Sequence, residues 1–225
     1  MGITLMENFR RPYASRSIGE FWTRWHISLS RWFRDYVYIP LGGNRVGEPT
    51  RLRNLIIVFL VSGLWHGASW TFVVWGALHA AYVIIEDLGG RFWPESQRAW
   101  LNKWVANVVA IAAVAFAWIF FRAGSIADAL YIATHLTSGA AAQVTHPAAL
   151  FSALSEVSPS RRELVIAALG IITMHYLEKA DAASDLRQRL AMQPIWRRWS
   201  AYYLVLLSLA LLGVYSNESF IYFQF

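Results

Sequence analysis

Six histidines are the residues of this 225-residue chain best suited to chemistry: His26, His66, His79, His135, His146 and His175. An imidazole can take up or release a proton near neutral pH and can bind a metal. The chain has no cysteine, so thiol nucleophiles and thiolate metal sites are absent. His26, His66 and His79 lie among apolar residues, where a polar group is costly and a functional role is the default hypothesis.

The other three histidines, His135, His146 and His175, are weaker candidates for a functional role. His135 and His146 fall in the connector 123–162, which is predicted as a long loop with one short helix. His175 lies near Glu178 and Lys179, at the charged end of its apolar segment, and can reach the interface there.

Two common histidine-based sites fit the sequence poorly. The chain has no HExxH motif and no acidic residue between positions 49 and 85, so a zinc site at His66 would need distant ligands. Ser62 and Ser69 flank His66, but no nearby carboxylate is available to orient it in a serine triad. We therefore predict no metal site. The remaining hypothesis is a histidine that acts as general base on a hydroxyl in a water-poor cavity.

The elements that carry these histidines are predicted to be membrane helices. Residues 54–85 contain no Asp, Glu, Lys or Arg. One helix of that length would measure about 48 Å, against a hydrocarbon core of roughly 30 Å. Because residues 62–69 hold two Gly and two Ser, we predict two segments that meet there and line an enclosed cavity. Further spans are predicted at 104–121, 164–177 and 199–217.

Residues 17–38 are predicted to form one amphipathic helix at the membrane interface. Ser17 and Glu20 have the spacing of a capping box, and aromatic and aliphatic residues recur every three or four positions. His26 falls on the apolar arc. Arg24, Arg31 and Arg34 are interpreted as interfacial anchors, and the neighbouring tryptophans as apolar wall.

Composition supports an all-α, polytopic transmembrane helical bundle with this interfacial amphipathic helix. The chain is 56% hydrophobic and only 15% charged. If residues 54–85 cross twice, 17 of the 20 Lys and Arg lie on one side, which the positive-inside rule makes cytoplasmic. The net charge of +6 is thus explained by a lipid bilayer, and no nucleic-acid partner is expected.

Two blocks of sequence resemble the membrane-bound O-acyltransferase family. The first block begins with Asn8-Phe9 and Pro12-Tyr13. Residues 21–30 then read Phe-Trp-Thr-Arg-Trp-His-Ile-Ser-Leu-Ser, and residues 32–45 complete the block. Residues 63–67 read Gly-Leu-Trp-His-Gly and are followed by Trp70, Trp75-Gly76 and His79. Within the family they resemble the alginate O-acetylation branch, which also includes the D-alanyl transfer protein of teichoic acid synthesis.

The resemblance implies an O-acyltransferase in which His66 is the catalytic histidine and His26 the second polar residue of the reaction chamber. It implies acetyl transfer to hydroxyls of an exported, alginate-like polysaccharide, through periplasmic partner proteins, in a multi-pass protein of the bacterial inner membrane. The implied donor is acetyl-coenzyme A or another acetyl thioester, with no bound cofactor.

The resemblance covers nearly all of this chain but only the C-terminal half of the family's domain. We therefore interpret residues 1–225 as the C-terminal portion of such a domain, with Met1 at an internal position of a family helix. Two alternatives stay open: a non-catalytic fragment, and a component of a proton-coupled transporter. The transporter hypothesis predicts pseudo-symmetric halves, and the sequence contains no internal repeat.

Overall fold

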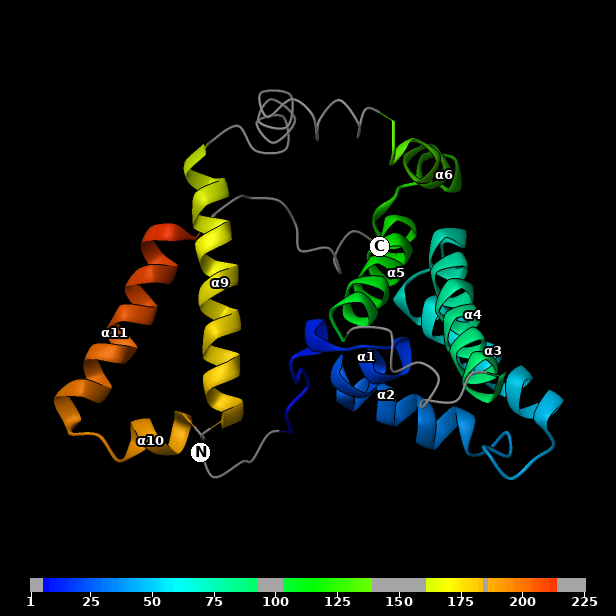
Figure 1. The fold of residues 1–225 in the computed structure, drawn as a ribbon, viewed down its shortest axis with the longest axis horizontal. Helices are drawn as coiled ribbons and strands as arrows, with labels where there is room; N and C mark the ends of the chain where they lie inside the picture. Colours follow the sequence, from blue (N-terminus) through cyan, green and yellow to red (C-terminus); the bar gives the residue numbers. More distant parts are fainter. Residues whose placement is uncertain (1–5, 93–102, 139–160, 184–185, 214–225) are drawn as a thin grey trace. The chain divides into compact units, whose positions relative to one another are not determined.

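The computed structural model describes residues 6–92, 103–138, 161–183 and 186–213, and within these ranges every regular element is a helix (Figure 1). The chain divides into two compact units, residues 1–137 and 138–225. The all-α prediction is therefore confirmed for the described residues. Each unit is described separately below.

Two long helices form the centre of the first unit. Helix α3 spans Glu48–His66 and helix α4 spans Trp70–Phe92, so the charge-free segment breaks at residues 67–69, within the predicted region. Helix α3 begins six residues earlier than the apolar pattern suggests, because Pro49 occupies its first turn, where a missing N–H costs nothing.

Helices α5 (Lys103–Arg122) and α6 (Ile126–His135) complete this unit beside α4. Ala110, Val114 and Ala117 lie three or four residues apart on α5 and are buried, so one face of α5 packs inward. Ser125 caps α6 by accepting a hydrogen bond from the Asp128 N–H. The short helix predicted in the connector is confirmed, although His135 is its last residue and does not lie in a loop.

The predicted helix over residues 17–38 is broken into three pieces. The 3₁₀ turn η1 (Pro12–Ala14) precedes α1 (Ile18–Arg24), α2 (Ile27–Phe33) and the π-helical turn η2 (Arg34–Tyr38). Ser17 caps α1 as predicted, with its Oγ 2.9 Å from the Glu20 nitrogen. The single-helix prediction was wrong at Trp25 and His26, where the backbone leaves helical geometry.

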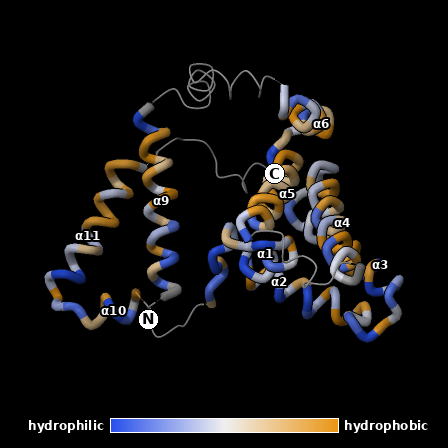
Figure 2. Tube along the Cα trace, viewed as in Figure 1, coloured by the Kyte–Doolittle hydropathy of each residue, from blue (hydrophilic) through white to orange (hydrophobic). Residues whose placement is uncertain are grey.

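Two helices of the described residues are long and apolar enough to cross a membrane: residues 70–90 of α4 and all of α5. Figure 2 shows hydrophobic residues along much of both helices. Only 28% and 22% of these segments are buried, so they are not the enclosed core helices of a soluble domain. Helices α3, α9 and α11, where further spans were predicted, do not meet the same length and hydropathy criteria.

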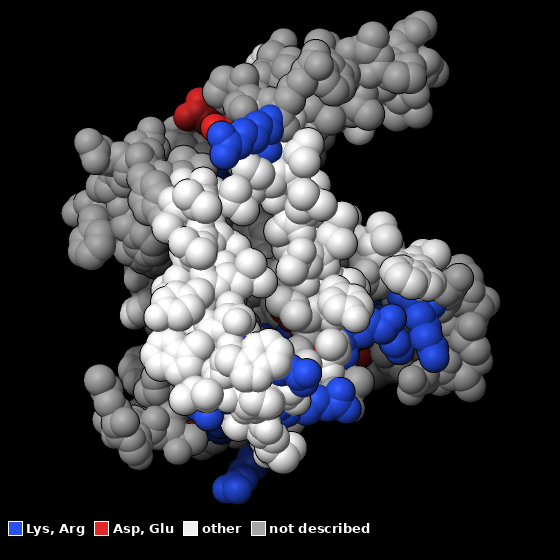
Figure 3. Space-filling model, turned by 90° about the vertical axis from the view of Figure 1, so that its left-hand side faces the viewer, with Lys and Arg blue, Asp and Glu red and all other residues white. Residues whose placement is uncertain are grey.

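The second unit contains α9 (Arg161–Ala183), α10 (Leu186–Ala191) and α11 (Ile195–Leu212). Charged residues stand near the ends of α9 and at the start of α11, and residues 164–177 and 199–212 carry no charge. Figure 3 shows a broad uncharged face with Lys and Arg gathered towards its upper and lower ends. This distribution suits a bilayer better than water.

Candidate active site

His66 is the last residue of α3 and stands at the break before α4. Its ring is enclosed by aromatic rings: the centroids of Trp65, Trp75 and Phe121 lie 5.0, 5.1 and 5.0 Å away. Its Nδ1 atom is buried and has no hydrogen-bond partner among the described residues. His66 is therefore partly buried among aromatic rings, and its Nδ1 has unused hydrogen-bonding capacity within the described residues.

His26 occupies the break between α1 and α2. Its φ of 44° is left-handed, which is unusual for a residue other than glycine. The break is stabilised by Asn8, whose carbonyl oxygen accepts from the Ile27 N–H at 2.9 Å and whose Oδ1 accepts from the Ser28 N–H at 3.0 Å. Asn8 thus does the capping that the His26 side chain does not do.

The two predicted site residues lie within electrostatic range of each other. The imidazoles of His26 and His66 are near enough for a charge on one to act on the other. Nδ1 of His26, like that of His66, is buried without a hydrogen-bond partner in the described part of the chain. Two imidazoles from sequence positions forty residues apart therefore lie within electrostatic range of each other, and each has aromatic neighbours.

Glycines set the distance between the helices that carry this site. A Cβ added at Gly63 of α3 would lie 2.3 Å from the carbonyl oxygen of Phe72 on α4. A Cβ added at Gly76 of α4 would lie 2.3 Å from the carbonyl oxygen of Phe59 on α3. The two backbones are in reciprocal contact, as small residues allow in membrane helix pairs. This contact fixes where the end of α3, and so His66, lies against α4.

Two polar contacts hold α1 on α4. The Glu86 carboxylate accepts from the N–H groups of Ile18 and Gly19, at 2.6 and 2.9 Å. Two turns earlier on α4, Nδ1 of His79 accepts from Nε1 of Trp22 at 3.3 Å. Because α1 leads directly into His26, these contacts help to determine where His26 lies.

Comparisons with known proteins identify the family to which these two histidine-bearing sequence blocks belong. The family model of the membrane-bound O-acyltransferases matches residues 2–133, which is nearly the whole first unit. The chain belongs to this family. The match contains both histidine-bearing blocks. In the first block the backbone is left-handed at His26, and in the second the helix breaks at residues 67–69, directly after His66.

Several curated relatives are acetyl-transfer proteins. The chain is 34% identical over its whole length to a probable alginate O-acetylase of Pseudomonas putida, of which it covers 47%. It is 49% identical over 56% of its length to a probable alginate O-acetylase of Azotobacter vinelandii, and 44% identical over 58% to a peptidoglycan O-acetyltransferase of Helicobacter pylori. The matched parts cover 24% of each of these two proteins. The chain thus spans about half the length, or less, of these relatives.

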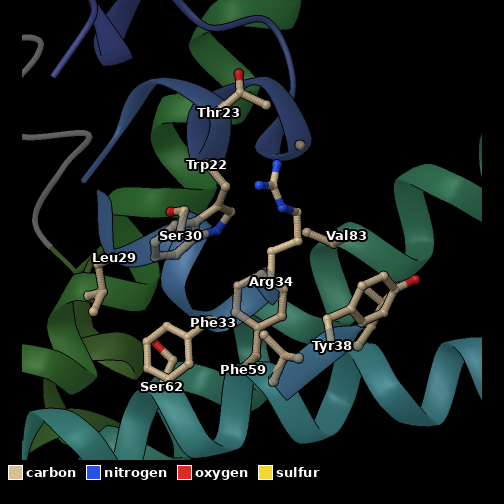
Figure 4. Close-up of a pocket in the computed structure, with 13 residues that line it drawn as sticks. Trp22, Thr23, Leu29, Ser30, Phe33, Arg34, Tyr38, Phe59, Ser62 and Val83 are labelled. Atoms are coloured by element: carbon tan, nitrogen blue, oxygen red, sulfur yellow. The ribbon is translucent and has the colours of Figure 1, made fainter. Parts of the chain in front are cut away.

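An apolar cavity of about 370 Å³ lies near His26 and His66, although neither of them lines it. Figure 4 shows the rings of Trp22, Phe33 and Phe59 around it, with the Arg34 side chain extending among them. Ser62, also in its wall, stands one helical turn before His66 on α3. The cavity therefore approaches the histidine pair from the side of α1 and α2.

Arg34 is a permanent cation at this cavity. Its Nε donates to Asp35 Oδ1 at 2.8 Å. This hydrogen bond raises the pKa of Arg34 and lowers the pKa of Asp35. Arg24 likewise has a carboxylate partner, Glu20, but neither Arg24 nor Arg31 lines the cavity, whereas Arg34 does. Of the three arginines interpreted as anchors, Arg34 is the one placed to meet a ligand there.

The other residues considered from the sequence are not shown to lie near His66 and His26. His135 is exposed on α6 and stacks on Tyr131, and His175 is exposed on α9. His146 lies outside the described residues. Ser69 hydrogen-bonds to Thr71, and no group of three His, Asp or Glu residues that could hold a metal ion occurs in the described ranges.

Sequence reasoning noticed His79 but assigned it no role. It is completely buried, and its partner Trp22 comes from a helix 57 residues away in the chain. The signal available was its spacing: His79 follows Trp75 by one helical turn and precedes Glu86 by two, so the three share a face of α4.

Proposed function

We propose that this chain carries the histidine pair of a membrane-bound O-acetyltransferase that acetylates hydroxyls of an exported, alginate-like polysaccharide. The observation that carries the proposal is the position of His66 among aromatic rings at the break between α3 and α4, with His26 within electrostatic range. Membership of the family and the acetyl-transferring relatives support the reaction type.

In the proposed reaction, an acceptor hydroxyl oxygen attacks the carbonyl carbon of an acetyl thioester. His66 takes the hydroxyl proton as the new C–O bond forms, and His26 donates a hydrogen bond to the oxyanion. When the C–S bond breaks, the proton on His66 passes to the departing thiolate. The products are an acetyl ester and a free thiol, and both histidines return to their starting states.

The donor is proposed to be acetyl-coenzyme A or another acetyl thioester that enters through the apolar cavity. The cavity suits the uncharged arm of such a donor, and Arg34 suits a phosphate at its charged end. The acetyl group is proposed to reach the polysaccharide through periplasmic partner proteins.

The proposed location is the bacterial inner membrane, with several crossings. The apolar exposed surfaces of α4 and α5 and the uneven division of basic residues support it. Single cysteines introduced at Ser96 and Ser138, on opposite flanks of α5, are expected to react with an impermeant thiol reagent from opposite sides. Reaction of both from one side would contradict the proposed topology.

The decisive test of function is acetyl release from polysaccharide. Cells carrying the complete reading frame are expected to yield polysaccharide from which mild base liberates acetate, and cells lacking it are not. Equal acetate from both would exclude the proposed function. Membranes containing residues 1–225 alone test the fragment hypothesis, since acetyl transfer by them would show that this chain is sufficient.

A further inference from the structure

His79 is a buried imidazole that the proposed reaction does not use. None of its surface is exposed, and its ring is surrounded by Trp22, Phe59, Trp75 and Tyr82 at centroid distances of 5.0, 6.2, 4.9 and 5.9 Å. An aliphatic side chain would fill such a space without the cost of burying two ring nitrogens. The imidazole therefore calls for an explanation beyond packing.

The contact with Trp22 fixes the tautomer of His79. An indole N–H can only donate a hydrogen bond, so Nδ1 of His79 must be the acceptor of the 3.3 Å contact. The neutral ring then carries its proton on Nε2. That Nε2 atom is buried and has no hydrogen-bond partner among the described residues. His79 is thereby held as a hydrogen-bond donor with no acceptor.

Trp75 links His79 to His66. Its ring contacts both imidazoles, with ring centroids 4.9 Å from His79 and 5.1 Å from His66. Nε1 of Trp75 and Nδ1 of His66 are also buried, and neither has a hydrogen-bond partner in the part of the chain that the structure describes. Three neighbouring rings thus each carry a buried nitrogen without a partner in the described part of the chain, and since buried polar groups are nearly always paired, a further polar group is expected there.

We infer that His79, held in its Nε2–H tautomer by Trp22, donates a hydrogen bond to an oxygen atom within the reaction chamber. The oxygen belongs to the acyl carbonyl or to a buried water that contacts the reactants. The inference rests on the proposed acyl transfer. It makes His79 a neutral donor and leaves proton transfer to His66.

Two substitutions separate the two nitrogens of His79. His79→Asn keeps an acceptor near Nδ1 for Trp22 but removes the donor at Nε2, whereas His79→Gln extends an amide donor towards the Nε2 position. In the protein expressed from its complete reading frame, we expect His79→Asn to lower the rate of acetyl transfer about 10- to 100-fold at normal abundance. His79→Gln is expected to restore part of that loss. A His79→Asn protein that transfers acetyl at the wild-type rate would overturn the inference. So would equal decreases of the transfer rate in both variants that are explained by a decrease in the amount of folded protein.

A spectroscopic measurement tests the tautomer without relying on activity. In ¹⁵N-histidine-labelled full-length protein, the His79 signals are identified as those that disappear in His79→Asn. They should be the signals of a neutral ring protonated at Nε2. Trp22→Phe should shift the signal of His79 Nδ1. A protonated Nδ1 would overturn the inference. A thioether analogue of acetyl-coenzyme A that keeps the carbonyl should shift the Nε2 signal if the acceptor is the acyl oxygen, and leave it unchanged if the acceptor is water. His66→Ala in the same transfer assay tests the proposed function separately.

Discussion

Gly63 of α3 faces the backbone of Phe72 on α4 so closely that a Cβ at Gly63 would lie 2.3 Å from the Phe72 carbonyl oxygen. Gly76 has the same relationship with Phe59, so each helix presents a glycine to the other's backbone. A methyl group at either position must push the helices apart, because a backbone carbonyl cannot rotate away as a flexible side chain can. The position of His66 at the end of α3 depends on this contact.

We therefore expect Gly63→Ala and Gly76→Ala each to destabilise the protein by about 1–3 kcal/mol, as overpacking does. Gly89→Ala is the matched control, since Gly89 lies on the same helix as Gly76 and its added Cβ meets nothing within 4 Å. The control should be neutral or more stable by up to about 1 kcal/mol, from helix propensity. Thermal unfolding of the detergent-solubilised protein measures all three. Equal melting temperatures would show that α3 and α4 are not in backbone contact.

Glu86 should hold the start of α1 in place. Glu86→Ala leaves the N–H groups of Ile18 and Gly19 without their acceptor, at a cost of about 1–3 kcal/mol. Trypsin is then expected to cleave faster after Arg16, which directly precedes the helix. Glu86→Gln keeps one acceptor oxygen and should lie between the wild type and Glu86→Ala. Identical cleavage in all three proteins would argue against the capping role.

Trp25 and Trp32 both belong to the recurring aromatic positions from which one amphipathic helix was predicted over residues 17–38, but the structure gives them different surroundings. Trp25 contacts Phe9, Phe21 and Trp118, whereas Trp32 is 49% exposed. Trp25→Asp should therefore prevent stable folding, by burying a carboxylate without a partner. Trp32→Asp should reduce membrane association more than folding. Abundance and extraction of the two variants by alkaline carbonate separate these effects, and equal behaviour would support the single continuous helix.

The errors of sequence reasoning have one physical source. The break at residues 67–69 was predictable, because a charge-free segment too long for one crossing contained Gly and Ser in its middle. The break at His26 was not, because the hydrogen bonds that stabilise it come from Asn8, outside the periodic pattern. The contact of His79 with Trp22 was likewise invisible, since it joins two helices across 57 positions. Local patterns located the histidines but not their partners.

Arg34 should affect donor binding more than chemistry. Arg34→Gln removes the cation at the cavity and is expected to raise KM for acetyl-coenzyme A about five-fold, on the order of 1 kcal/mol, with kcat little changed. Arg31→Gln is the control, because Arg31 is exposed on the neighbouring turn of α2 and does not line the cavity. Steady-state transfer with varied donor concentration measures both. An unchanged KM in Arg34→Gln would place the charged end of the donor elsewhere.

His66 should be indispensable for transfer and dispensable for folding. His66→Ala removes the proposed base from its place among the rings of Trp75 and Phe121. Loss of a general base typically costs 10²–10⁴-fold, about 3–5 kcal/mol of barrier. Membrane abundance should stay near that of the wild type, because the His66 Nδ1 makes no hydrogen bond within the described residues.

The accompanying histidine variants give this prediction its specificity. His26→Ala should impair transfer less completely, because His26 is proposed to stabilise charge and not to take the proton. His135→Ala, on the exposed face of α6, should retain most activity. Acetate released from polysaccharide, divided by the amount of membrane-inserted protein, ranks the three. An active His66→Ala protein at normal abundance would remove His66 from the chemistry. The next residues to test would then be Trp75 and His79, whose buried ring nitrogens have no partner among the described residues.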